Sequence, residues 1–169
     1  MTRHLLSIAL LCATAACVQA EPDGPLPDAF ATYGYDNGSL PPPYREEFRA
    51  EFSRSGMVLL TACRGYDDSG CVSMTAPMKD GGMLRIEQSA RASGLAERPA
   101  RKNPQPPIGG GLAWGKVVLD GGQTCDAIAL PAEGDVARVE ALLAALDAEI
   151  PDAARAQVNA TADRKSEGN

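Results

Sequence analysis

The sequence predicts an α+β protein in which two β-hairpins, each followed by a helix, form one four-stranded antiparallel sheet with both helices on a single face. The strongest signal is Asp120-Gly121 between two apolar runs, because such residues reach the positive φ values of a tight hairpin turn. Helically spaced apolar residues follow and end at Ile150. An earlier pair of runs around Ser55-Gly56 repeats the pattern, so the expected order is ββα-ββα.

The N-terminus has the pattern of a secretory signal peptide. Arg3 precedes an apolar run from Leu5 to Ala16, and small residues lead to Ala20, so cleavage there would remove residues 1–20. The run is about twelve residues long, well short of the roughly 20 that cross a bilayer. We therefore expect an exported protein, either periplasmic or anchored by a lipid in a bacterial cell envelope.

A second processing route competes with signal cleavage. Residues 13–17 resemble a bacterial lipobox, in which Cys17 would be lipidated and residues 1–16 removed. Thr14 departs from that pattern, where leucine is commonest. With a lipid at Cys17, the proline-rich segment 21–43 would be a semi-rigid tether to the membrane; the alternative is a disordered leader.

A single domain is expected over residues 44–151. Tyr33 and Tyr35, just before it, are expected to pack on the domain, with partner binding as the alternative. Residues 44–52 place aromatic side chains at every fourth position, which suits either a helix or one face of a strand. The apolar, β-branched run 57–64 that follows a short turn favours a hairpin of two strands.

One disulfide is expected in the domain. Cys63 and Cys71 flank a turn-rich loop, and their proximity makes them the predicted pair; pairing of either one with Cys125 is the alternative. Asp67 and Asp68 in that loop indicate a solvated turn, because two adjacent carboxylates do not supply the roughly six or more oxygens that calcium takes.

The rest of the chain is assigned from its periodicity and its turn residues. Gly94 is expected to end a short helix. Residues 152–169 are polar, rich in alanine and without a clear apolar stripe, which indicates a flexible tail. The remaining expected elements are a helix at 83–93, a loop at 95–111, strands at 112–119 and 124–130, and a helix at 135–150.

The strand at 112–119 offers the first candidate surface for a partner. Alternation places Trp114 and Lys116 on the same side of this strand. Because lysine avoids a core, that side is expected to be the open one. Trp114 would then be an anchor for a partner, since tryptophan is enriched at interface hot spots; the alternative is a core tryptophan with Lys116 at the margin.

The loop at 95–111 offers the second candidate surface. It carries the one basic cluster, Arg98, Arg101 and Lys102, followed by three prolines. Long loops inside compact domains are often functional, and prolines reduce the entropy lost on docking. A linker that only joins the two halves is the alternative.

Charge and composition argue against several functions. The net charge is −6, and −7 once Arg3 is removed, whereas nucleic-acid binding depends on clustered Lys and Arg. The only histidine, His4, would leave with the signal, so no imidazole remains for a catalytic triad or a zinc site. No phosphate-binding glycine motif and no Cys-x-x-Cys motif is present. We expect no cofactor, no metal and no catalysis.

These observations predict a non-catalytic protein-binding module, in its sharpest form an inhibitor or an immunity-type protein. A structural or accessory lipoprotein without a dedicated ligand is the nearest alternative, and a thiol-dependent enzyme is the second.

Overall fold

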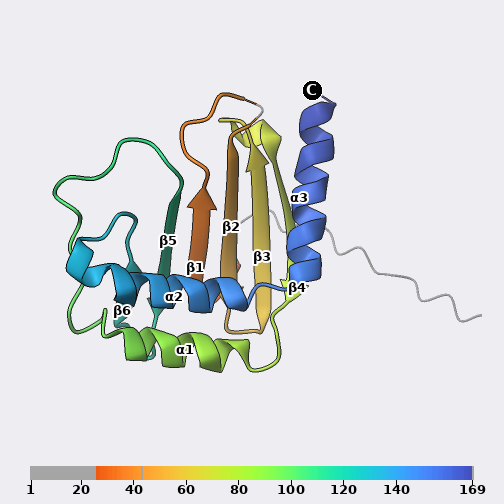
Figure 1. Ribbon diagram of the computed structural model, residues 1–169. Helices are drawn as coiled ribbons and strands as arrows, with labels where there is room; N and C mark the ends of the chain where they lie inside the picture. Colours follow the sequence, from red (N-terminus) through yellow and green to blue (C-terminus); the bar gives the residue numbers. More distant parts are fainter. Residues whose placement is uncertain (1–25, 43, 169) are drawn as a thin grey trace, which may run out of the picture.

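The computed structural model describes residues 26–42 and 44–168, which form one antiparallel sheet of six strands and three helices (Figure 1). The strands are β1 (Ala29–Asp36), β2 (Glu46–Ser53), β3 (Met57–Arg64), β4 (Cys71–Pro77), β5 (Leu112–Val118) and β6 (Thr124–Ala127). The helices are α1 (Gly82–Ser93), α2 (Val136–Ala148) and α3 (Asp152–Glu167). None of these helices has the length and apolar character that crossing a membrane requires. The expected signal peptide and the lipidation site at Cys17 lie outside the described residues.

The sheet is built from a four-stranded meander extended on one side. Its strand order is β4-β3-β2-β1-β5-β6. The chain returns through α1 and a long loop, so that β5 pairs with the free side of β1. The α+β class and the antiparallel sheet are therefore confirmed. The expected four strands and the ββα repeat are wrong, because β1 and β4 also belong to the sheet.

The two additional strands differ in pattern: β4 alternates apolar with polar residues, whereas β1 has consecutive buried residues and a register shift between Ala29 and Ala31. β1 lies inside the segment 21–43 that was expected to be an arm, and it occupies the centre of the sheet between β2 and β5. Because its burial does not alternate and prolines flank it in the sequence, β1 gives no clear strand signal. In β4, Val72, Met74 and Ala76 alternate with polar residues and pack on the core.

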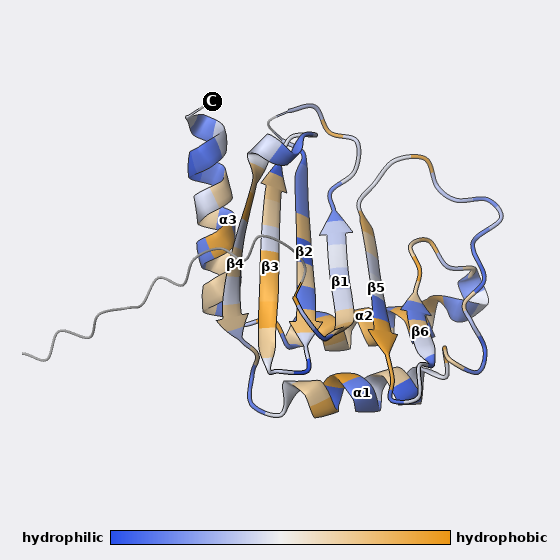
Figure 2. Cartoon of the chain, turned by 180° about the vertical axis from the view of Figure 1, so that it is seen from behind, coloured by the Kyte–Doolittle hydropathy of each residue, from blue (hydrophilic) through white to orange (hydrophobic). Residues whose placement is uncertain are grey.

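α2 and α3 lie over one face of the sheet, and α1 packs against α2 beneath the ends of the strands (Figures 1 and 2). Gly115 of β5 faces α2, because a Cβ built there would lie 2.7 Å from Cδ1 of Leu146 in that helix. Cross-strand pairing assigns the same face to Tyr33, its partner in β1. The largest fully buried side chains of the core are Phe30, Phe48, Phe52, Leu60, Ile86, Leu95, Leu142, Leu146 and Ile150.

The C-terminal segment is a helix packed on the sheet, whereas a flexible tail was expected. Ala154, Val158 and Ala162 recur every four residues along α3 and are buried against β3 and β4. Arg64 of β3 reinforces this contact by donating a hydrogen bond of 2.7 Å to Asp163. Two alanines and one valine give little hydrophobic contrast, which explains why the stripe was missed.

The other expected elements are present with small shifts at their ends, except that the strand expected at 124–130 ends at Ala127. Residues 46–53 form a strand, which confirms the hairpin with β3. α1 ends at Gly94, which has the left-handed φ of 62° that favours glycine there. In the β5–β6 turn the positive φ values belong to Gly121 and Gly122 rather than to Asp120.

Candidate functional site

Three loops lie together at one end of the sheet (Figure 1). They are residues 37–42 and 44–45 between β1 and β2, residues 65–70 between β3 and β4, and residues 104–111 before β5; we call this region the loop end. It carries most of the exposed large apolar side chains of the described chain: Leu40, Tyr44, Tyr66 and Ile108. The others, Met83 and Leu84, lie on α1.

The disulfide closes the β3–β4 loop at its base. Cys63 and Cys71 form a cross-strand pair with an S–S distance of 2.03 Å, which confirms the predicted pairing. Asp67 accepts hydrogen bonds from the backbone N–H and the hydroxyl of Ser69, and the hydroxyl lowers the pKa of the Asp67 carboxyl. The loop is therefore fixed by a covalent closure and by a local turn.

The β3–β4 loop presents Tyr66 in a defined orientation. The Tyr66 hydroxyl donates a hydrogen bond of 2.9 Å to the carbonyl of Leu40. The Arg45 guanidinium lies 4.8 Å from the centre of the tyrosine ring, a cation–π distance. Arg45 also donates to the Gly65 carbonyl at 3.1 Å. The ring is held from two sides and is still 59% exposed.

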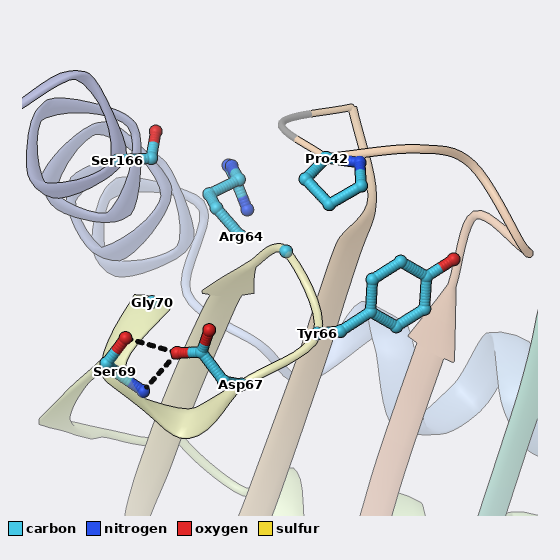
Figure 3. Close-up of a pocket in the computed structure, with 8 residues that line it drawn as sticks. Pro42, Arg64, Tyr66, Asp67, Ser69, Gly70 and Ser166 are labelled. Atoms are coloured by element: carbon cyan, nitrogen blue, oxygen red, sulfur yellow. Dashed lines mark hydrogen bonds between the residues drawn. The ribbon is translucent and has the colours of Figure 1, made fainter. Parts of the chain in front are cut away.

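A hollow lies on each side of Tyr66. The first has a volume of about 270 Å³ and lies between the β3–β4 loop and the end of α3 (Figure 3). The second, also about 270 Å³, lies between Tyr66 and the residues Pro107, Gly109 and Gly110. Tyr66 thus stands as a partition between two surface depressions, an arrangement that can receive side chains of a partner.

The base of the long loop before β5 is fixed by one buried carboxylate. Asp135 is 3% exposed. One of its carboxylate oxygens accepts two hydrogen bonds from Arg101, one from the backbone N–H and one from the side-chain Nε, both at 3.1 Å. Its other oxygen accepts Nη2 of Arg138 at 2.7 Å. The hydrogen bond from Arg138, followed by those from Arg101, holds the pKa of the Asp135 carboxyl well below its usual range.

Arg138 ties the same base to α1. Its Nη1 donates to the carbonyls of Ser93, Gly94 and Arg98 at 3.3, 3.2 and 3.0 Å. The backbone of Asn103 pairs with Leu130, and that of Arg101 with Ala132. The segment 95–103 is thus anchored, and residues 104–111 project beyond it.

The projecting tip carries an isolated apolar side chain. Ile108 is fully exposed between two prolines and three glycines. The tip approaches the β1–β2 loop, since a Cβ built on Gly38 would lie 2.6 Å from the carbonyl oxygen of Gly110. Ile108 and Tyr66 therefore belong to loops that meet at the loop end.

The basic residues proposed for partner contact lie at the anchored base of the loop rather than at its tip. Arg101 is engaged with Asp135, although its side chain is 75% exposed. Lys102 forms a backbone bridge with Pro131, and the Arg98 carbonyl accepts from Arg138. Of these three side chains, that of Arg101 fastens the loop, whereas Arg98 and Lys102 make their contacts at the base through backbone atoms and expose their side chains.

Trp114 and Lys116 are not part of the loop end. They lie on the face of β5 opposite Gly115, on the side of the sheet that no helix covers. Lys116 is 4.0 Å from Asp126 on the neighbouring strand β6. The structure therefore separates the two candidate surfaces that the sequence suggested.

Sequence reasoning missed Tyr66 and Ile108. A signal existed for Ile108, because a single β-branched residue between Pro-Pro and Gly-Gly-Gly cannot be part of a helix or a buried strand. Tyr66 stood in a loop assigned to a solvated turn. Its placement depends on Arg45 and Leu40, which are distant in sequence.

Of the cysteines that the structure describes, Cys125 is the one outside the disulfide, and it is not placed for chemistry. Cys125 is buried on the helix-covered face, and its sulfur lies 3.4 Å from the Ala90 carbonyl. Burial raises the pKa of this thiol, which disfavours the thiolate. Within the described ranges, no three His, Cys, Asp or Glu side chains come together as metal ligands.

No protein-family model matches the chain, and no curated protein matches it either. The class of protein is therefore defined by the structure: an α+β protein with a disulfide, helices on one face of an antiparallel sheet, and a loop end that carries exposed apolar side chains.

Proposed function

We propose that this chain is an exported envelope protein that binds another protein through its loop end and does not act as a catalyst. The observation that carries the proposal is Ile108, an isoleucine fully exposed at the tip of a loop whose base is fastened to a buried carboxylate. When a partner buries an apolar side chain held out in this way, the free energy of the complex is lowered. Because the base is already ordered, docking would cost little conformational entropy.

Tyr66 supports the same surface. Tyrosine is enriched at hot spots because it buries a large area with few rotatable bonds. Here its ring is held by Arg45 and by the Leu40 carbonyl before any partner arrives. The hollows on its two sides offer space for side chains of the partner. An inhibitor or an immunity-type protein, which blocks a partner by covering it, is the form of binding that such a surface suits best.

Export agrees with the disulfide, since disulfides persist in non-reducing compartments. The thiol-enzyme alternative gains no support from Cys125, which is buried with a raised pKa. The alternative of a lipoprotein without a dedicated ligand does not account for the exposure of Ile108 or for the fastened base of its loop.

The test is capture of the partner from an envelope extract by the immobilised, disulfide-bonded protein, followed by titration of the purified partner. We expect Ile108→Ser and Tyr66→Ala each to weaken the partner's affinity by about tenfold or more. Leu84→Ser is the matched control, because Leu84 is 57% exposed on α1, outside the loop end. Equal affinity for all three variants and the wild type would exclude the loop end as the binding surface.

A further inference from the structure

In the strands that the structure describes, the open face of the sheet carries one aromatic side chain, and it lies across a glycine. Trp114 of β5 is paired with Gly34 of β1. A Cβ built on Gly34 would lie 2.6 Å from Cε2 and Cζ2 of the indole and 2.9 Å from Nε1. The ring therefore occupies the space above Gly34 that a side chain would fill. The helices pack on the other side of the sheet, so none of them covers this ring (Figure 2).

A hollow of about 340 Å³ lies beside the indole. It is lined by Trp114, by Thr32 of β1 and by Arg49 and Glu51 of β2. These polar side chains supply a guanidinium donor, a carboxylate acceptor and a hydroxyl that is both. The Arg49 side chain is 59% exposed, although it also pairs with Glu47. The hollow thus combines a flat π surface with mixed hydrogen-bonding groups.

The charges around the hollow balance each other. Arg49 and Glu51 lie on its rim, and farther out Lys116 stands beside Asp126. A strongly anionic ligand such as a nucleic acid would meet the carboxylates, and a basic peptide would meet Arg49 and Lys116. The site therefore favours an uncharged ligand that both donates and accepts hydrogen bonds.

From this combination we propose that the Trp114 face binds a neutral glycan chain, with a pyranose ring stacked on the indole. A β-linked pyranose presents a flat face of C–H groups, and the face of an aromatic ring carries negative charge density that attracts them. The hydroxyl groups at the edge of the sugar can accept a hydrogen bond from Arg49, donate one to Glu51, and do either with Thr32. The volume is at the small end of ligand sites, which suits recognition of about one ring at a time. This site is separate from the loop end and independent of the protein partner.

The chain offers a direct probe, because Trp114 is its only tryptophan. Tryptophan emission of the full disulfide-bonded protein is recorded during titration with cellohexaose and with the hexamer of N-acetylglucosamine. We expect a saturable change in emission with at least one of them. Arg49→Ala should weaken the binding about fivefold through the lost hydrogen bond. Glu47 keeps Arg45 as an ion-pair partner in that variant, so the fold should be retained.

Trp114→Ala, followed by calorimetry, should weaken glycan binding about fivefold to tenfold. Tyr66→Ala and Ile108→Ser are the controls and should leave the glycan titration unchanged, so failure of the loop-end proposal and failure of this one can be told apart. An emission that changes with neither sugar would overturn the glycan site. So would a purified protein partner whose capture depends on Trp114 and Arg49 while both sugars remain without effect.

Discussion

The two faces of the sheet use the same strands in opposite ways. On the covered face, side chains such as Phe52 and Leu60 are fully buried beneath the helices. On the open face, Arg49, Glu51 and Lys116 remain in contact with solvent, and Trp114 lies across Gly34 without a helix above it. Because neighbouring residues of a strand point to opposite faces, one alternating sequence encodes both surfaces. The buried apolar side chains of the core lie on the covered face, so we expect substitutions there to cost more stability than substitutions on the open face.

The largest expected effect is on the covered face. Phe52→Ala removes a side chain that is 0% exposed at the centre of the core. It should lower the free energy of unfolding by about 3–5 kcal/mol, because the transfer free energy of the ring is lost and a cavity remains. Urea denaturation followed by circular dichroism measures this loss.

The matched change on the open face is Thr61→Ala. Thr61 lies in the adjacent strand β3 and makes a hydrogen bond of 2.9 Å to Ser73. Loss of this hydrogen bond should lower the free energy of unfolding by no more than about 1 kcal/mol, which is the range of a single cross-strand pair. Comparable losses for Phe52→Ala and Thr61→Ala would show that the two faces contribute equally to stability.

Two glycines allow the same comparison at a single pair of strands. Gly115→Ala places a methyl group 2.7 Å from Leu146 Cδ1 and 3.0 Å from the Thr32 carbonyl oxygen, in a core that cannot move away. It should cost about 1–3 kcal/mol of unfolding free energy. Gly34→Ala instead meets the indole of Trp114, which can swing toward solvent.

Gly34→Ala should therefore change stability by less than about 1 kcal/mol, since Ala also reduces the entropy of the unfolded chain. It should shift the tryptophan emission to longer wavelength as the ring becomes solvated. The two measurements, unfolding free energy and emission, are made on both variants. A larger loss for Gly34→Ala than for Gly115→Ala would show that the open face is packed as tightly as the covered one.

The alternation on which this comparison depends could be predicted only in part. The strand at β5 and the faces of Trp114 and Gly115 follow from period-two reasoning alone. The hairpin of β2 and β3 and the Cys63–Cys71 disulfide also depend on neighbours in sequence. Local signals were sufficient where the contacts are local.

The missed parts depend on distant contacts. β1 is a strand because it is held between β2 and β5, and its partner Gly115 lies far along the chain. α3 is ordered because a weak stripe of small residues meets β3 and β4 and because Arg64 reaches Asp163. At the loop end, Tyr66 is positioned by Arg45. The two members of each of these contacts lie too far apart in the sequence for a local pattern to reveal them.

A pH-dependent effect is expected at Tyr33, a phenol on the covered face. Burial, followed by the charge of Asp147 and a hydrogen bond to that carboxylate, raises the pKa of Tyr33 from 10.0 to about 12. The folded state thus retains the phenol proton to a higher pH than the unfolded state does. Its contribution to stability is complete below about pH 10 and is lost as the pH rises toward 12.

Tyr33→Phe isolates that contribution from the other groups that titrate in alkali. Phenylalanine keeps the ring in the core but has no ionisable proton, so the variant should lose less stability than the wild type between pH 10 and pH 12. The urea midpoint is measured for both proteins across that range. Parallel losses of stability would mean that the Tyr33 phenol is solvated, and that the covered face admits water at the junction of α2 and β1.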